Sequence, residues 1–428
     1  MRVSRFDWDG QEPAALAAEI RALQPTLGEV SAAVAEIIDA VREGGDRAVA
    51  ELEARFGGAS ESGAVRQPDE AIRTARSRVG GELVSALETA AANIEVVAEA
   101  QLADASEVRL EQGQSVAVRE VPVVSAGIYA PGGTAAYPST VLMGCIPAKV
   151  AGVERVVLAT PANAGDQQVP DVILAAAAIA GADEVYAMGG AQAVAALAIG
   201  TERIRPVDVI AGPGNRFVQE AKRQLTGEVG IDGLAGPSEL MVIAGDTAKA
   251  DWIALDLCAQ AEHGPDGLLV AGAVETVLLD RMEESVARVA GERRIAEDAT
   301  LALVAVPDTA TAVTLANAIA PEHLELVTED AELLAGTVTT AGCVFVGELS
   351  ATAFGDYAAG SNHVLPTGGA GRFQGPLGPG AFRRRIAIVE IPRPAAQALA
   401  PTVATLARAE GFPLHADSVE ARAEDQGR

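Results

Sequence analysis

The feature that most constrains the fold is an alternation of short β-branched runs with alanine-rich helical runs, which begins near residue 117. The strand-like runs read REVPVV, VERVVLAT, DEVYAM, PVDVIAG, ELMVIAG, GLLVAG, LALVAV and GCVFVG. Strands that alternate with helices in this way form βαβ units, in which the strands pair in parallel. The sequence therefore predicts an α/β protein built on doubly wound parallel sheets.

The segments on either side of this alternation have other patterns. Residues 13 to about 102 repeat apolar side chains at three- and four-residue spacing, which predicts helices. After residue 380 the chain offers one strand-like run, RRRIAIVEI, then a helix and a charged end. This tail is too small to fold alone, so we expect it to pack on another domain or another subunit.

The amino-acid composition argues against several classes of partner. The 428 residues include 32 Lys plus Arg and 59 Asp plus Glu, which gives a net charge of −27. Such a charge disfavours nucleic acids and anionic membranes as partners. No apolar run approaches the roughly 20 residues that a membrane-spanning helix needs, and the polar N-terminus does not resemble a signal peptide. We expect a cytoplasmic protein.

The three cysteines, Cys145, Cys258 and Cys343, are far apart and form no CxxC pair. An odd number of isolated cysteines argues against a disulfide framework and favours a reducing compartment. Each cysteine lies in an apolar stretch, which favours a buried thiol over a nucleophile.

Four glycine-rich turns follow predicted strands, at residues 130–134, 188–192, 211–215 and 235–239. Doubly wound folds hold ligands at turns of this kind, where glycine permits close backbone approach and helix N-termini favour phosphate. The chain contains neither GxGxxG nor GxxxxGK[ST]. The turns are consistent with a nucleotide site and equally with simple chain reversal.

Only four histidines occur, and each stands close to carboxylate or amide side chains. Gln260 and His263 are three residues apart in a segment with a helical pattern, so they share one helix face near its C-terminal end. This spacing lets two ligands hold one metal ion. A histidine at a helix C-terminus can also cap carbonyl groups without binding a metal.

Two further motifs lie late in the chain. Asp356 and His363 bracket a loop-like segment, and Glu410 and His415 lie near the end of the last predicted helix, where a histidine is more often solvated than ligating. Considered together, these motifs supply nitrogen and oxygen donors without thiolate, which suit zinc, and manganese or cobalt nearly as well. The candidate ligands are Gln260, His263, Asp356 and His415.

Glu322 and His323 differ from the other motifs because they are adjacent, directly after Pro321, which fits the first position of a helix. Neighbours on a helix point about 100° apart, so they would act as two separate groups. Their reference pKa values, about 4.3 and 6.5, suit two bases that work in two steps. The alternative is a glutamate that meets the helix dipole beside a half-exposed histidine.

These motifs, in this order, resemble those of the histidinol dehydrogenase family. The resemblance covers about residues 30 to 420 and rests on the strings YAPGG, STVLM, GGAQA, GPGN, EAKRQ, GID, AGPSE, QAEHG, APEHLE, GDYAAGSNHVLPT and AEGFPLH. It implies oxidation of L-histidinol to L-histidine through L-histidinal, the last steps of histidine biosynthesis. The two NAD-linked steps would occur at one site with one zinc per subunit.

The resemblance also implies roles for individual residues. Gln260, His263, Asp356 and His415 match the family's zinc ligands, and Glu322 and His323 match its acid–base pair. The positions that match substrate contacts are Ser238, Gln260, His263, His323, Asp356, His363, Glu410 and His415. The positions that match NAD contacts are Tyr129, Gln192 and Asn215.

The family's fold implies two incomplete Rossmann-like domains in an intertwined homodimer. We therefore expect residues 26–128 and 238–380 to form a first, discontinuous domain, and residues 129–237 to form a second, NAD-binding domain. Residues 381–428 would pack on the partner subunit, while residues 1–25 form an N-terminal segment without a clear match.

Three stretches depart from the family pattern: Gly233, residues 374–381 and residues 412–414. None of them is a predicted zinc or acid–base position. They bear on the packing of the tail and on the shape of the pocket.

Two alternatives stay open. A relative with the same fold and the same zinc and NAD chemistry could act on another small alcohol, such as a sulfonated diol, although no motif supplies the basic side chain that a sulfonate needs. A zinc hydrolase or a non-catalytic acidic module would leave the nucleotide-loop matches without a purpose.

Overall fold

A computed structural model describes residues 1–24, 28–57, 65–103, 105–132, 135–162, 168–293 and 299–424. The chain divides into two compact units. The main unit comprises Met1–Gln101 and Val124–Phe382, and the tail unit comprises Leu102–Val123 and Arg383–Arg428.

The main unit contains two six-stranded sheets. The first, here called the β5 sheet, has the strand order β2-β7-β6-β5-β8-β9. All its strands are parallel except β2, which pairs antiparallel with β7 at the edge. Its strands are β2 (Val65–Arg66), β5 (Ser125–Tyr129), β6 (Arg155–Thr160), β7 (Glu184–Ala187), β8 (Val209–Ala211) and β9 (Gly230–Ile231).

The second sheet, here called the β10 sheet, is parallel throughout, with the order β1-β12-β11-β10-β13-β14. Its strands are β1 (Arg2–Asp7), β10 (Glu239–Ala244), β11 (Leu268–Ala273), β12 (Thr300–Ala305), β13 (His323–Val327) and β14 (Cys343–Val346). The N-terminal segment therefore contributes an edge strand to a sheet whose other strands come from the second half of the chain.

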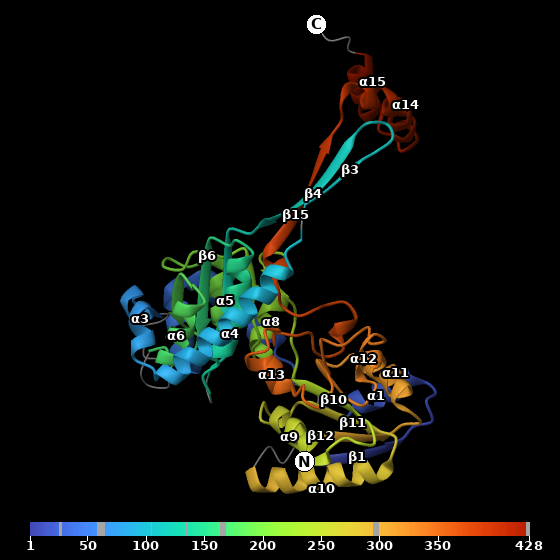
Figure 1. The fold of residues 1–428 in the computed structure, drawn as a ribbon. Helices are drawn as coiled ribbons and strands as arrows, with labels where there is room; N and C mark the ends of the chain where they lie inside the picture. The colour runs from blue at the N-terminus through green and yellow to red at the C-terminus, as the bar shows by residue number, and fades with distance from the viewer. Residues whose placement is uncertain are drawn as a thin grey trace. The chain divides into compact units, whose positions relative to one another are not determined.

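Helices cover both faces of the β10 sheet, because successive side chains of a strand point to opposite sides. Leu240, Val242 and Ala244 of β10 share a core with α9 (Ala250–Ala261) and α10 (Thr276–Arg293). The intervening Met241 and Ile243 pack with α1 (Pro13–Arg21), α11 (Thr309–Ile319) and α12 (Ala331–Ala335). Figure 1 shows α9 and α10 on one side of these strands and the other three helices on the opposite side.

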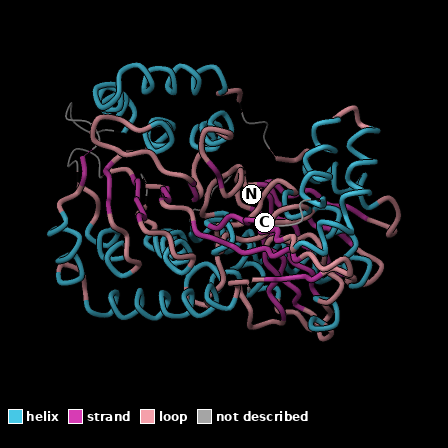
Figure 2. Tube along the Cα trace, turned by 90° about the horizontal axis from the view of Figure 1, so that it is seen from above, coloured by secondary structure: helices cyan, strands magenta, loops and turns pink. Residues whose placement is uncertain are grey.

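The β5 sheet is covered in the same way, and Figure 2 shows helices on both sides of its strands. One core combines its buried residues with α2 (Ser31–Leu52), α7 (Gly190–Ile199) and α8 (Arg216–Leu225). A second group of helices packs together around α5. Its members are α3 (Asp69–Thr74), α4 (Gly81–Ala100), α5 (Pro138–Val150) and α6 (Asp171–Ile179).

Shorter helices connect these elements. They are η1 (Glu53–Gly57, a π-helix), η2 (Ala75–Ser77), α13 (Thr352–Tyr357), η3 (Ala370–Arg372) and η4 (Pro379–Phe382). Among the helices within the described ranges, none combines the length and apolar character that a membrane crossing requires.

The tail unit has its own antiparallel sheet, with the order β15-β4-β3. Its strands are β3 (Ser106–Arg109), β4 (Ser115–Pro122) and β15 (Arg383–Glu390). Two helices, α14 (Arg393–Ala409) and α15 (Pro413–Glu424), pack together through a small core that contains Ala404, Ala407 and Ala416.

The prediction of an α/β protein with parallel sheets is confirmed. One predicted strand was assigned wrongly: the REVPVV run at 119–124 lies mostly in β4, which pairs antiparallel with β15 in the tail unit. The tail unit is accordingly larger than the expected 381–428, because residues 102–123 belong to it. A hairpin of this kind needs a distant third strand, which local periodicity does not reveal.

The packing of the early helices also differs from the expected division of the chain. We expected residues 26–128 to belong with 238–380, but α2 contacts α7 and α8, and α4 contacts α5, all on the β5 sheet. Of the expected N-terminal segment 1–25, the described residues 1–24 join the β10 sheet through β1 and α1. Helix periodicity identifies an apolar face but not the sheet that this face covers.

Close packing between α5 and β5 gives a test of the fold. A Cβ atom at Gly144 of α5 would overlap the Cγ2 atom of Ile128 in β5, whereas Gly291, exposed on α10, has open space around it. We expect Gly144→Ala to lower the free energy of unfolding by about 1–3 kcal/mol through overpacking. The matched variant Gly291→Ala should leave it unchanged or raise it by up to about 1 kcal/mol. Denaturant unfolding of both variants checks this, and equal midpoints would contradict the packing.

Candidate active site

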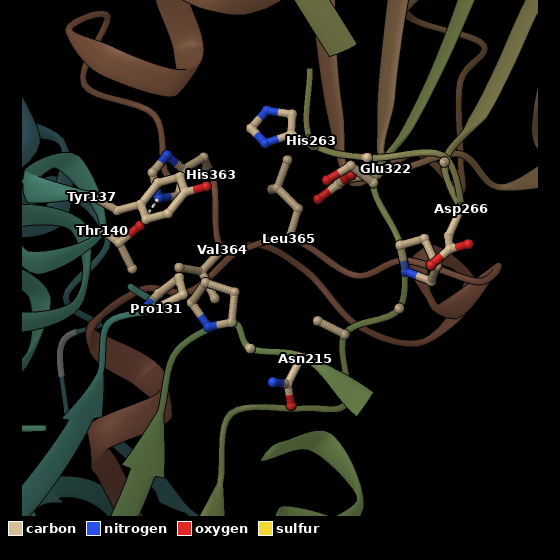
Figure 3. A pocket seen from close by; sticks show the side chains of 18 of the residues that line it. Pro131, Tyr137, Thr140, Asn215, His263, Asp266, Glu322, His363, Val364 and Leu365 are labelled. Atoms are coloured by element: carbon tan, nitrogen blue, oxygen red, sulfur yellow. Dashed lines mark hydrogen bonds between the residues drawn. The ribbon is translucent and has the colours of Figure 1, made fainter. Parts of the chain in front are cut away.

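A pocket of about 840 Å³ in the main unit is lined by loops of both parallel sheets (Figure 3). The β5 sheet contributes the turns that follow β5 and β8, which include Pro131 and Asn215. These are the carboxyl ends of two adjacent strands. The β10 sheet contributes the amino ends of its strands, with Ser238 just before β10 and Glu322 just before β13. Of the turn at 130–134, residues 133 and 134 lie outside the described residues.

Glu322 and His323 lie at the start of a strand, so the expected helix start at Pro321 is wrong. Helix α11 ends at Ile319, and Ala320 adopts a left-handed conformation with φ 50° and ψ 62°. The residue before a proline avoids the right-handed helical region, so the chain turns here and enters β13. Both side chains are buried, which also excludes the half-exposed histidine.

Both side chains bond to the peptide groups of Glu239 in the adjacent strand β10. The Glu239 N–H donates to Glu322 Oε2 at 2.8 Å, and His323 Nδ1 lies 3.0 Å from the Glu239 carbonyl oxygen. His323 Nδ1 therefore carries the proton that this carbonyl accepts, which leaves Nε2 as the unprotonated nitrogen of the neutral ring. That atom lies 3.4 Å from Asp356 Oδ1 but forms no aligned hydrogen bond.

Burial and neighbouring charges change the pKa values of Glu322 and His323. Burial raises the pKa of Glu322 to about 7, despite the opposing charge of His323 and the bond from Glu239. Burial alone would lower the pKa of His323, but the negative charges of Glu322 and Asp356 outweigh it and raise the pKa to about 9. Glu322 can thus exchange protons with a ligand near neutral pH, whereas the raised pKa of His323 favours its protonated form there while the charge of Asp356 is not offset.

Gln260 and His263 lie on either side of the C-terminal end of α9, so the helix includes only the first residue of the expected pair. Gln260 is in the last turn, and the backbone N–H of His263 still bonds to its carbonyl oxygen at 3.2 Å. Gln260 is buried, yet its side-chain amide Nε2 has no hydrogen-bond partner among the described residues. His263 is exposed and lines the pocket.

Asp356 comes from α13 and His363 from the loop that follows it, and both line the same pocket. His363 Nδ1 lies 3.0 Å from the Asp356 carbonyl oxygen, and Nε2 lies 2.9 Å from Thr140 Oγ1 of α5 (Figure 3). Both ring nitrogens are thus bonded in a neutral ring, and burial lowers the pKa of His363.

The donors in this pocket fit a metal ion. Gln260, His263 and Asp356 offer an amide, an imidazole and a carboxylate, a set that suits zinc. The unpartnered amide of buried Gln260 is free to turn its oxygen toward a cation. Within the described ranges no cluster of three or more His, Cys, Asp or Glu side chains has metal-binding geometry.

The remaining predicted residues of this group belong to the tail unit. Glu410 caps the C-terminal end of α14, and His415 lies in α15, where its ring is tilted against Phe412 with centroids 5.4 Å apart. Both side chains are exposed in this chain and are not among the residues that line the pocket.

The opposite wall of the pocket favours anions. Asn215 is the N-cap of α8, and its side-chain oxygen accepts from the N–H groups of Phe217 and Val218. Arg216 follows it, exposed and lining the pocket. Arg216 was not among the predicted site residues, although its position just after the GPGN turn, at the start of a helix, is a signal for an anion contact.

Tyr129 and Gln192 are brought together, but in the interior. Both are buried and neither lines the pocket. The N–H of Gly190 donates to the Tyr129 hydroxyl at 3.1 Å, while Gln192 Nε2 and the N–H of Gly189 donate to Glu53 Oε1, each at 2.8 Å. Burial raises the pKa of Tyr129 to about 12. Tyr129 and Glu53 therefore hold the backbone of the turn at 189–190 from the interior of the protein, and Gln192 bonds to the same Glu53 carboxylate.

The cysteines are unpaired thiols. Cys145 and Cys258 are buried, as expected, and burial raises the pKa of Cys145 to about 12. Cys343 is half-buried with a pKa raised by burial to about 11, so none of the three is a thiolate near neutral pH.

Comparison with known proteins identifies the family of the chain. A family model, histidinol dehydrogenase, matches residues 22–423. The histidinol dehydrogenase of Pseudomonas aeruginosa is 43% identical over 405 residues, 93% of this chain and 92% of that protein. The one of Rhizobium meliloti is 44% identical over 402 residues, 92% of each. The crystal structure of histidinol dehydrogenase from Elizabethkingia anophelis covers 99% of this chain and 98% of its own, with a TM-score of 0.91 and 30% identity. The chain belongs to the histidinol dehydrogenase family.

Proposed function

We propose that the chain oxidises L-histidinol to L-histidine in two steps, with NAD as the hydride acceptor and one zinc per subunit. The observation that carries the proposal is a single pocket that joins nitrogen and oxygen donors, a buried acid–base pair and an anion-favouring helix start. The overall reaction consumes one water and two NAD and yields two NADH and three protons. It would serve the last steps of histidine biosynthesis.

Zinc would be held by Gln260, His263 and Asp356, and by His415 of the C-terminal tail. It would orient the substrate through its amine and imidazole nitrogens. Because the tail is a separate unit, we propose that it packs on the partner subunit of an intertwined homodimer. The substrate would also contact Ser238, His363 and, from the tail, Glu410.

NAD would bind to the β5 sheet, where the order β7-β6-β5-β8-β9 supports an incomplete Rossmann-like fold. In such sheets ligands bind at the carboxyl ends of the strands where the order reverses, which here are β5 and β8. Asn215 and Arg216 stand at this point, at the N-terminus of α8, and suit the pyrophosphate. Tyr129 and Gln192 would support the neighbouring glycine turn.

His323 would act as the base in alcohol oxidation, because Nε2 is the ring nitrogen that no carbonyl holds. It accepts the hydroxyl proton as hydride leaves the carbinol carbon. Its raised pKa reflects the charges of Glu322 and Asp356, and a cation bound by Asp356 would offset part of this effect. The carboxylates beside it also favour a cationic amino alcohol over an anionic substrate.

Glu322 would act in the second step, in which the aldehyde adds water before the second hydride leaves. With a pKa raised to about 7, its carboxylate can take a proton from the attacking water and return it to solvent. The pair thus divides the work: His323 serves the alcohol and Glu322 serves the water.

The yield of NADH tests the function directly. We expect two equivalents of NADH per L-histidinol consumed, lost on chelation and restored by zinc. One equivalent would mean a stalled aldehyde, and faster turnover of a sulfonated diol would favour the alternative substrate. No NADH from histidinol with zinc-replete protein would refute the proposal.

Metal content tests the ligand assignment. We expect Asp356→Ala and His263→Ala to lose zinc while circular dichroism and size-exclusion profiles stay unchanged, because each removes a proposed ligand. Glu262→Gln is the matched control, since Glu262 lies between two proposed ligands but does not line the pocket. Elemental analysis after dialysis measures the zinc. A variant that keeps stoichiometric zinc would overturn the assignment of that residue.

The pH dependence of aldehyde oxidation tests the role of Glu322. A base must be ionised, so the rate with L-histidinal should rise with pH up to about 7 and level off above it. Glu322→Gln should remove this rise and slow the step about 100- to 10,000-fold, while the first NADH equivalent in a single turnover falls less. An unchanged pH profile in Glu322→Gln, with Glu262→Gln as reference, would exclude Glu322 as the base.

A further inference from the structure

One side chain of the N-terminal segment, Arg21, contacts the residue that holds the acid–base pair, Glu239. Arg21, the last residue of α1, donates from Nη1 to Glu239 Oε1 at 2.8 Å and from Nη2 to Glu239 Oε2 at 3.2 Å. It also donates from Nε to the carbonyl oxygen of Ile319 at 3.2 Å and from Nη2 to that of Ala320 at 3.5 Å. A single guanidinium thus ties α1 to β10 and to the end of α11.

Glu239 connects this contact to the site. Its carboxylate is 2% exposed and also accepts from the N–H of Gly368 at 3.0 Å. Its own N–H bonds to Glu322 and its own carbonyl to His323. A shift of Glu239 would therefore move the hydrogen-bond partners of both acid–base side chains.

The two carbonyl groups that Arg21 contacts belong to a turn with a strained backbone, at Ile319 and Ala320. Ala320 has φ 50°, a left-handed conformation that alanine rarely adopts. Such residues persist where the surrounding structure holds them, and they concentrate at functional sites. Arg21 bonds to the carbonyl of this residue and of the one before it, directly ahead of the Pro321-Glu322-His323 segment.

We propose that Arg21 is a positioning residue, and that the Arg21–Glu239 clamp sets the orientation of Glu322 and His323. Arginine suits this place because its planar fork can meet a carboxylate with two parallel bonds while other N–H groups reach carbonyls. Lysine offers one point charge and cannot span the same set. The clamp gives the N-terminal segment, β1 and α1, a role in the reaction. The inference rests on the proposed function in one respect: its kinetic test uses histidinol oxidation as the assay.

Variants of the zinc-loaded protein test the clamp. We expect Arg21→Ala to lower kcat for histidinol oxidation about 100-fold, the loss expected from a misplacement of about 1 Å. KM for histidinol and zinc content should stay within about twofold of wild type, because Arg21 touches no proposed ligand. Arg21→Lys should recover part of kcat.

Arg5 provides a matched control in the same segment. It lies in β1 and pairs with Asp280 and Glu283 of α10, but its side chain is 46% exposed and has no link to the site. Arg5→Ala should keep kcat within about twofold of wild type. An equal loss in both arginine variants would overturn the clamp in favour of a general weakening of the segment.

A spectroscopic readout separates the clamp from the proposed reaction. With four histidines in the chain, the imidazole carbon–proton signals of labelled protein can be assigned by comparison with His323→Gln. The His323 signal should move in Arg21→Ala and Arg21→Lys but not in Arg5→Ala. An unmoved His323 signal, or wild-type kcat, in Arg21→Lys would overturn the clamp, even where Arg21→Ala does not fold. Wild-type protein without activity on histidinol would refute the proposed reaction, while the His323 signal would still decide on the clamp.

Discussion

The geometry of the site depends on the main-chain groups of one residue, Glu239. The N–H fixes the carboxylate of Glu322 and the carbonyl fixes the imidazole of His323. Because β10 and β13 are paired in parallel, with Leu240 opposite His323, Glu239 stands next to the start of β13. The bond to Nδ1 selects the tautomer of His323 and leaves Nε2 available for chemistry. A substitution of the Glu239 side chain removes neither of these backbone groups. The surrounding structure must therefore hold the backbone of Glu239 in the orientation that meets both side chains.

The β5 sheet meets the pocket with the carboxyl ends of its strands, and the β10 sheet meets it with the amino ends. The two sides of the pocket therefore differ in the charge that they favour. On the side of the β5 sheet the pocket meets the N-terminus of α8, with Arg216 beside it, and both favour an anion. On the side of the β10 sheet it meets the C-terminal end of α9, where His263 lies, together with the carboxylates of Glu322 and Asp356. Helix C-termini and carboxylates favour a cation. A pocket with these two ends suits a dinucleotide on one side and a metal with a cationic amine on the other.

Most of the parallel strands and part of the pocket lining could be predicted from the sequence, while the partners of each element could not. The short spacing of Gln260 and His263 predicted that they lie close together, although α9 ends between them. β13 was missed because His323 and Glu325 are buried polar residues that interrupt an apolar run, and because Pro321 reads equally well as a helix start. The Arg21–Glu239 pair joins residues 218 positions apart. No local pattern connects them, so only the assembled sheet reveals that the N-terminal segment reaches the site.

Two buried atoms on the pocket wall show what the fold leaves for a ligand. Among the described residues, Gln260 Nε2 and His323 Nε2 are shielded from solvent and lack hydrogen-bond partners. An unsatisfied buried polar group costs about 1–3 kcal/mol, a cost that native proteins seldom leave uncompensated. The two atoms belong to α9 and β13, the elements that supply a proposed metal ligand and a proposed base. A ligand that bonds to both groups would recover that cost, which favours binding at this position of the pocket.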